Sequence, residues 1–187
     1  MRAFLALTLP DEIRRSLTAL QRELSHAGAD VKWVETPNLH VTLKFLGEIS
    51  DEQRQSVEQL LREVARDETA FALGLDRVGA FPSLSSPRVV WVGLGEGTAR
   101  AGRLAERLEQ GCRGLGMQQE ERPFAAHVTL GRVRSPRGTH ELVVALKAAS
   151  WNPPGPWTVE VVTLYQSALS SHGPNYNVLA EVSLKSG

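Results

Sequence analysis

The tetrapeptide His-Val-Thr-Leu occurs twice in this chain, first at His40 and again at His127. Its alternation of polar and apolar residues is typical of a β-strand, whose successive side chains point to opposite faces of the sheet. Valine and leucine then share one face, suited to a hydrophobic core, and histidine and threonine share the other. The repeat therefore predicts two strands that each present one histidine and one threonine on a polar face.

Chance and simple packing are the competing explanations of this repeat. Given one copy, a second at one of the other four histidines has a composition-based probability on the order of one in a few hundred. A single histidine on a strand could merely satisfy a backbone carbonyl. Two identical copies in similar settings instead favour a functional arrangement, in which His40 with Thr42 and His127 with Thr129 line one cleft.

Strand-like and helix-like stretches alternate along the rest of the chain. Apolar residues at helical spacing, bounded by capping residues, predict helices over Pro10–Ala27, Ser50–Asp67, Thr98–Gly114 and Thr139–Ala148. Ser50 and Thr139 are predicted N-caps, and Gln53 completes a capping box with Ser50. Predicted strands span Arg2–Leu9, Val31–Glu35, Leu39–Gly47, Phe71–Phe81, Arg88–Leu94, Ala126–Val133, Thr158–Ser167 and Tyr176–Leu184, and predicted loops span Pro82–Pro87 and Ser150–Trp157.

Short turns between neighbouring strands favour an α+β fold with mostly antiparallel sheets over a doubly wound parallel sheet. The two halves of the chain are also alike, since each has a helix, a His-Val-Thr-Leu strand and another helix. We therefore expect residues 1–187 to form a single bilobal domain. Each of its two pseudo-symmetric lobes would carry helices on the outer face of its sheet, with the active-site cleft between the lobes.

Charge and cysteine content restrict the classes of function and location. Lysine and arginine total 21, as do aspartate and glutamate, so no overall field attracts a polyanion and any anion site must be local. The single cysteine, Cys112, cannot form an intrachain disulfide and is expected to be a partly buried thiol rather than a nucleophile. The N-terminal apolar run meets Pro10 too early for a signal peptide or a membrane span. We expect a cytoplasmic, monomeric protein without a membrane segment.

Two facing imidazoles are suited to acid–base catalysis, because histidine accepts and donates protons near neutral pH. At a phosphodiester, one histidine would activate water or a hydroxyl and the other would protonate the leaving oxygen. The threonine hydroxyls and a cation would hold the nonbridging oxygens. The predicted catalytic residues are His40 and His127, and the predicted phosphate-binding residues are Thr42, Thr129 and Arg132.

Arg132 is the candidate cation of this site. It lies in a stretch, Arg122–Gly138, that contains four arginines and no acidic residue. Arg132 lies five residues after His127, and an odd spacing places two side chains on opposite faces of a regular strand. A β-bulge, which Gly131 would permit, is therefore needed to turn Arg132 into the cleft. For Arg134 and Arg137, a solvated basic edge strand is the alternative explanation.

Five segments resemble the two-histidine phosphoesterase superfamily, which is defined by two His-x-Thr-x motifs. They are RAFLALTLPDEIR, NLHVTLKFLGE, VGAFPSLSSPRVVWVGL, RPFAAHVTLGRV and LYQSALSSHGPNYNVLAEVSL, and they are distributed from Arg2 to Leu184, so the resemblance extends over nearly the whole chain. The similarity is greatest to the bacterial RNA 2',3'-cyclic phosphodiesterases, historically called 2'-5' RNA ligases. One departure is Ala126, because the family usually has proline before the second histidine.

The resemblance implies a two-lobed α+β fold that opens the 2',3'-cyclic phosphate at an RNA end to a 2'-phosphate. It also implies ATP-independent 2'-5' joining of RNA ends, with no metal and no cofactor. By position, His40 corresponds to the family's proton donor and His127 to its proton acceptor. Thr42 and Thr129 correspond to its phosphate-binding threonines, and Arg132 to an arginine often found five residues after the second histidine.

Other functions are also compatible with the residues. The same fold could act on a cyclic dinucleotide or a linear 2'-5' oligonucleotide, or the chain could be a non-catalytic module that binds RNA or a partner. A zinc hydrolase with His40 and His127 as ligands would need a third ligand, usually at short local spacing, and no such pattern exists.

Aromatic residues and the remaining histidines are not predicted as site residues. Phe45, Phe81, Trp91 and Tyr165 could stack on bases, but their strand positions favour core packing. We expect His26, His140 and His172 to be exposed or structural.

Overall fold

The computed structural model describes all residues from 1 to 187. Its strands are β1 (Arg2–Thr8), β2 (Val31–Trp33), β3 (His40–Glu48), β4 (Phe71–Leu73), β5 (Leu75–Ser83), β6 (Ser86–Leu94), β7 (His127–Val133), β8 (Trp157–Val159), β9 (Val161–Ser170) and β10 (Gly173–Ser183). One eight-stranded antiparallel sheet has the order β10-β9-β1-β3-β7-β6-β5, with β2 beside β7, and β4 pairs with β8 separately. The predicted α+β fold with antiparallel sheets is confirmed.

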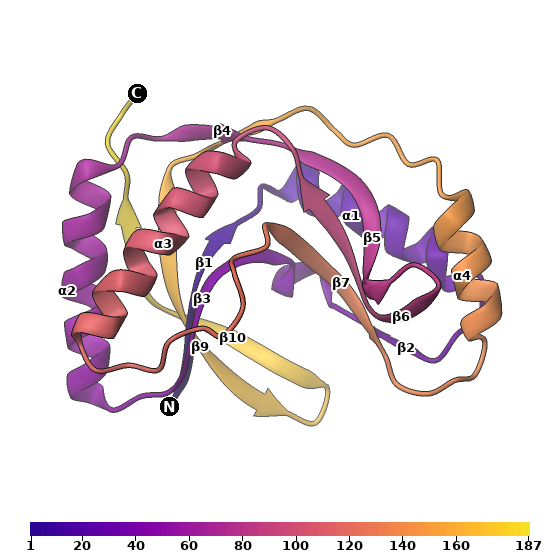
Figure 1. The fold of residues 1–187 in the computed structure, drawn as a ribbon, viewed down its shortest axis with the longest axis horizontal. Coiled ribbons are helices and arrows are strands. Elements are labelled where there is room, and N and C mark those ends of the chain that lie inside the picture. The colour runs from indigo at the N-terminus through magenta and orange to yellow at the C-terminus, as the bar shows by residue number, and fades with distance from the viewer.

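Four helices pack on this sheet: α1 (Asp11–Ser25), α2 (Asp51–Asp67), α3 (Thr98–Gly114) and α4 (Thr139–Ala148), and a short 3₁₀ helix, η1 (Thr36–Asn38), precedes β3. Figure 1 shows α2 and α3 at one end, near β1, β3, β9 and β10, and α1 and α4 at the other, near β5, β6 and β7. Each end of the sheet therefore carries one helix from the first half of the chain and one from the second. No helix combines the length and apolar character needed to cross a membrane.

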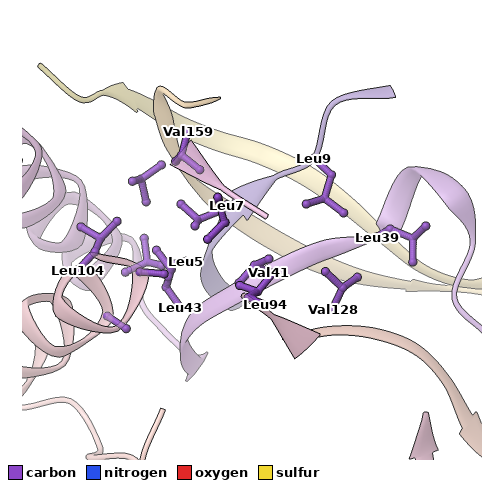
Figure 2. Close-up of a cluster of buried hydrophobic side chains, with 14 of the residues drawn as sticks. Leu5, Leu7, Leu9, Leu39, Val41, Leu43, Leu94, Leu104, Val128 and Val159 are labelled. Atoms are coloured by element: carbon purple, nitrogen blue, oxygen red, sulfur yellow. The ribbon is translucent and has the colours of Figure 1, made fainter. Parts of the chain in front are cut away.

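The hydrophobic core lies between the helices and one face of the sheet. Leu5 and Leu7 of β1, Val41 of β3 and Val128 of β7 are fully buried. Figure 2 shows these side chains gathered with Leu104 of α3 in one apolar cluster. Burying a side chain of this size contributes roughly 1.5–3 kcal/mol. The valines of the two repeats therefore anchor β3 and β7, as the alternation predicts.

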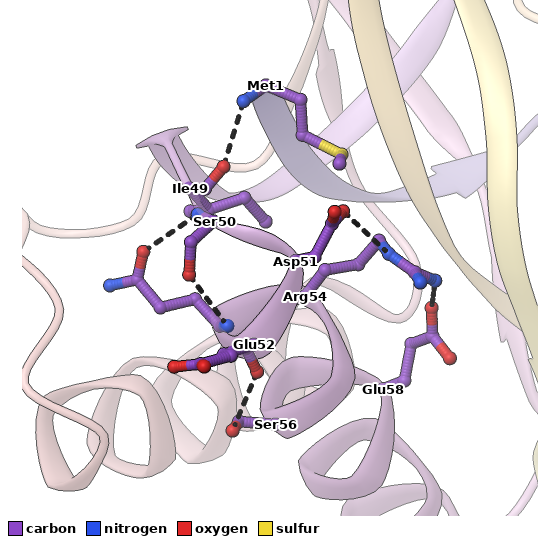
Figure 3. Close-up of polar contacts among 9 residues, drawn as sticks. Met1, Ile49, Ser50, Asp51, Glu52, Arg54, Ser56 and Glu58 are labelled. Carbon is purple, nitrogen blue, oxygen red and sulfur yellow. Dashed lines mark hydrogen bonds and ion pairs between the residues drawn. The ribbon is translucent and has the colours of Figure 1, made fainter.

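The N-terminus of α2 is capped as predicted. Ser50 Oγ accepts a hydrogen bond from the Gln53 backbone N–H at 3.1 Å, and Gln53 Oε1 accepts one from the Ser50 N–H at 3.0 Å. The terminal amino group of Met1 also donates to the Ile49 carbonyl at 2.8 Å (Figure 3). The capping box satisfies the backbone donors of Ser50 and Gln53, and the bond from Met1 fixes the connection between the motif strand β3 and α2.

The predicted N-cap of α4 is wrong. Thr139 is the first helical residue, and its hydroxyl is buried without a hydrogen-bond partner. The cap position is Gly138, with φ near +70°, and a β-carbon there would lie 2.7 Å from Cα of Ala29. The close approach of a distant segment therefore requires glycine at the cap, which local sequence does not reveal.

The predicted loop Pro82–Pro87 is also mostly strand. β5 continues to Ser83 and β6 begins at Ser86, so only two residues form the turn. β5 is the last strand of the sheet, and an edge strand tolerates a proline that cannot donate to the ladder. The prolines therefore mark the end of a hairpin rather than a long loop.

Candidate active site

The two motif strands pair with each other at the centre of the sheet. Val41 of β3 is the antiparallel partner of Val128 of β7, and this pair joins the two halves of the eight-stranded sheet. On that register His40 lies across from Thr129, and Thr42 lies across from His127. Since the two valines point into the core, the four polar side chains share the opposite face, which we call the open face.

Each imidazole is oriented by a backbone carbonyl two residues earlier in the chain. Nδ1 of His40 lies 2.6 Å from the Asn38 oxygen, and Nδ1 of His127 lies 2.6 Å from the Ala125 oxygen. A carbonyl oxygen only accepts hydrogen bonds, so each Nδ1 carries a proton and each neutral ring presents Nε2 as an acceptor. Nε2 of His40 accepts from the Thr42 hydroxyl at 2.8 Å.

Burial is the largest influence on both histidines and lowers the pKa of each below its ordinary value. The hydrogen bonds to the backbone carbonyls act in the opposite direction. The positive charge of Arg132 lowers the pKa of His127 further, and the charges of His127 and Arg14 do the same for His40. Both imidazoles are therefore poised as neutral bases near pH 7, and a bound phosphate would favour protonation.

Aromatic rings account for the burial of His40. Phe4 of β1 lies 5.0 Å from it, centroid to centroid, and Tyr176 of β10 meets it edge-on at 5.4 Å. Tyr165 stacks on Phe4 at 5.3 Å and extends this wall. Tyr176 was not predicted as part of the site, because it comes from a strand that is distant from His40 in the sequence.

A second aromatic group flanks His127. Phe81 meets its ring edge-on at 5.3 Å, and the Trp91 ring lies at 6.3 Å. The Trp91 indole lies across Gly79, where a β-carbon would come within 2.2 Å of its Cη2. Glycine at this position thus lets the indole lie against β5 beside the histidine.

A β-bulge in β7 brings Arg132 to the open face. The register against β6 slips by one residue between Thr129 and Gly131, which leaves Leu130 unpaired. Leu130 and Gly131 are consequently both buried, and Arg132 is exposed on the side of Thr129. Glycine is needed at the bulge because a β-carbon there would lie 2.7 Å from a side chain of β2.

An equivalent bulge occurs in β3, where the register against β1 slips at Leu43. The following Lys44 is therefore buried, with its Nζ 2.9 Å from Glu109 Oε2. Phe45 turns to the open face and is 60% exposed, at the position that corresponds to Arg132 in the other repeat. A groove of about 480 Å³ is lined by Lys44–Gly47 and Gln118–Arg122, and neither histidine contributes to its lining.

The prediction that four aromatic side chains pack in the core is wrong for all of them. Phe45 and Phe81 do not pack in the core, because they are 60% and 38% exposed. Trp91 and Tyr165 are half-buried on the open face. The bulge reverses the alternation of buried and exposed side chains at Phe45. For the others, a position on a strand does not tell which of the two sheet faces is covered by helices.

The other chemically active side chains lie away from this site. Cys112 is fully buried, and burial raises the pKa of its thiol to about 11, as expected for a structural cysteine. His26, His140 and His172 are exposed, as predicted. No group of three histidine, cysteine, aspartate or glutamate side chains is arranged to hold a metal ion.

Comparison with known proteins agrees with the duplicated architecture. The family model of LigT-like phosphoesterases matches the chain twice, over residues 7–91 and 92–176, one match for each histidine motif. The RNA 2',3'-cyclic phosphodiesterase of Archaeoglobus fulgidus is 37% identical over 179 residues, which cover 96% of this chain and 98% of the relative. That of Aeropyrum pernix is 34% identical over 166 residues, covering 89% and 93%.

Solved structures show the same fold. TT0787 of Thermus thermophilus superimposes with a TM-score of 0.82 at 33% identity, covering 100% of this chain and 99% of that one. Escherichia coli LigT complexed with 3'-AMP superimposes with a TM-score of 0.79 at 31% identity, covering 98% and 97%. The chain belongs to the family of LigT-like phosphoesterases.

Proposed function

We propose that this protein hydrolyses the 2',3'-cyclic phosphate at an RNA end to a 2'-phosphate by two-histidine acid–base catalysis. The observation that carries the proposal is the pairing of Val41 with Val128, which sets two oriented imidazoles and two threonine hydroxyls on one face of the sheet. Full-length relatives that carry the name RNA 2',3'-cyclic phosphodiesterase support this choice of substrate.

In the proposed reaction, Nε2 of neutral His127 accepts a proton from water as the water oxygen attacks phosphorus. The bond between phosphorus and the 3' oxygen breaks, and protonated His40 donates its Nε2 proton to that oxygen. The negative charge of the bound phosphate favours this protonated form, against the effect of burial. The two histidines then regain their starting protonation states by exchange with solvent.

The hydroxyls of Thr42 and Thr129 donate to the nonbridging oxygens, and Arg132 offsets the charge that accumulates on them in the transition state. If a 5'-hydroxyl of a second RNA end replaces water, the same displacement joins the ends through a 2'-5' linkage without ATP. In the reverse reaction the two histidines exchange their roles. None of these steps requires a metal or an organic cofactor.

The test is product analysis on an oligoribonucleotide that ends in a 2',3'-cyclic phosphate, with a chelator present. We expect a 2'-phosphate product, and a loss of roughly 10²–10⁴-fold in kcat for His40→Ala and for His127→Ala. His26→Ala is the matched control, because this exposed histidine lies at the end of α1 and should leave the rate unchanged.

Several outcomes would overturn the proposal. Absence of turnover, or wild-type turnover by the His40→Ala, His127→Ala double variant, would remove the assigned chemistry. RNA binding that survives loss of both histidines, with no turnover by the wild type, would indicate a binding module instead. A higher kcat/KM for a cyclic dinucleotide or a linear 2'-5' oligonucleotide would replace the substrate.

A further inference from the structure

Two cationic side chains lie side by side on the open face. Lys32 of β2 is the direct antiparallel partner of Arg132 of β7, and directly opposite residues share one face. Arg132 is also paired with Val89 of β6, which lies two residues from Trp91 and therefore on the same face as its indole. Both cationic side chains are exposed.

This pair has no acidic partner. Like charges directly opposite each other across two strands destabilise a sheet. Neither Lys32 nor Arg132 forms an ion pair, whereas the nearby Arg134 lies 2.9 Å from a carboxylate oxygen of Asp30. An anion bound between the two cations would relieve their repulsion.

The hairpin of β9 and β10 approaches Lys32 with its tip, and its one acidic residue, Glu181, lies near the far end of β10. Its whole stretch Val161–Ala180 contains no aspartate, glutamate, lysine or arginine. The position of a β-carbon on Gly173, at the hairpin tip, would lie 3.9 Å from Cε of Lys32. Asn38 Nδ2 donates to the Pro174 oxygen at 2.8 Å, which ties this tip to the start of β3. Figure 1 shows the hairpin projecting beyond the body of the sheet.

We propose that Lys32 binds a backbone phosphate on the 5' side of the reacting cyclic phosphate, so that the site recognises an RNA strand and not only its last nucleotide. This inference rests on the proposed function, in which Arg132 faces the reacting phosphate. Lys32 lies next to Arg132 on the neighbouring strand, and successive phosphates of a strand would place one charge at each cation. The uncharged tip of the hairpin then borders the path of the RNA strand without repelling it.

The experiment compares two substrates that differ only in their additional nucleotides and phosphates. One is a hexaribonucleotide ending in adenosine 2',3'-cyclic phosphate, and the other is adenosine 2',3'-cyclic phosphate itself. For Lys32→Ala, we expect the ratio of kcat/KM for the hexamer to kcat/KM for the mononucleotide to fall about tenfold. The slope of log kcat/KM against log salt for the hexamer should become shallower by about 0.7, the value for one phosphate contact on a single strand.

Two further variants serve as controls. Lys32→Arg should retain most of the preference for the hexamer, because it keeps the charge. Lys147→Ala removes the same charge from the exposed side of α4, and it should change neither substrate ratio nor salt slope. Urea unfolding of each variant confirms that the comparison is made between equally folded proteins.

Equal losses on both substrates, or an unchanged hexamer preference in Lys32→Ala, would overturn the inference. If the wild type turns over neither substrate, the proposed function fails separately. Fluorescence anisotropy with a labelled hexamer that ends in a 3'-phosphate still tests Lys32 in that case. An unchanged salt slope of binding in Lys32→Ala would then refute the phosphate contact.

Discussion

Replacing Lys44 by methionine tests the buried ion pair beneath the motif strand β3. The Lys44 side chain is 1% exposed, and its Nζ lies 2.9 Å from both Glu109 Oε2 and the Gln118 carbonyl oxygen. Methionine keeps most of the volume but leaves Glu109 without its cation. Breaking a buried pair costs about 3–5 kcal/mol. Glu109 is 19% exposed and also accepts from the Glu120 N–H at 2.9 Å, so we expect a loss at or just below the lower end of this range, roughly 2–3 kcal/mol.

Urea unfolding of Lys44→Met and of the double variant Lys44→Met, Glu109→Leu measures this cost. The double variant should recover most of the lost stability, because removing both charges leaves no unpaired carboxylate. Arg54→Ala is the surface control: Arg54 pairs with Glu58 on the side of α2, and its loss should cost about 0.5 kcal/mol. A loss below about 1 kcal/mol in Lys44→Met, or a double variant less stable than Lys44→Met, would refute the reasoning.

Three other substitutions test the site. Burial and Arg132 lower the pKa of His127, the proposed base. On the acid limb, kcat/KM should therefore begin to fall only below pH 6.5, the ordinary pKa of histidine, where His127 becomes protonated. In a pH–rate profile, Arg132→Ala should shift this acid limb to higher pH, and an unmoved limb would contradict the assignment. Gly131→Val should cost about 1–3 kcal/mol in urea unfolding, since its β-carbon would lie 2.7 Å from β2, whereas Gly114→Ala, with open space around it, should cost almost nothing. Phe45→Ala should raise KM for an oligoribonucleotide about 5- to 100-fold, as expected for a lost base stack, with little change in stability because the ring is 60% exposed; an unchanged KM would exclude such stacking.

Local sequence patterns predicted the helices and strands well where each element is determined by interactions between residues close in sequence. Helix α3 has the predicted bounds, and α2 has the predicted capping box, since both depend on residues within one or two turns. The predicted cap of α4 failed for the opposite reason: Ala29, far earlier in the chain, approaches Gly138 so closely that only glycine fits. The contact between Tyr176 and His40 could not be predicted from local sequence either, because only the order of the strands in the sheet brings the two rings together.

The sequence by itself determined that two strands would bury valine and leucine and present histidine and threonine together, because alternation along a strand requires only the residues of that strand. Only the tertiary structure decided where the residues after each motif point. A bulge in each strand reverses the alternation, so that Lys44 enters the core while Phe45 and Arg132 turn to the open face. Pairing with β2 then sets Lys32 beside Arg132. Bulges and pairing partners depend on neighbouring strands that are distant in sequence, so the full set of charges and rings around the two histidines emerges only when the sheet is assembled.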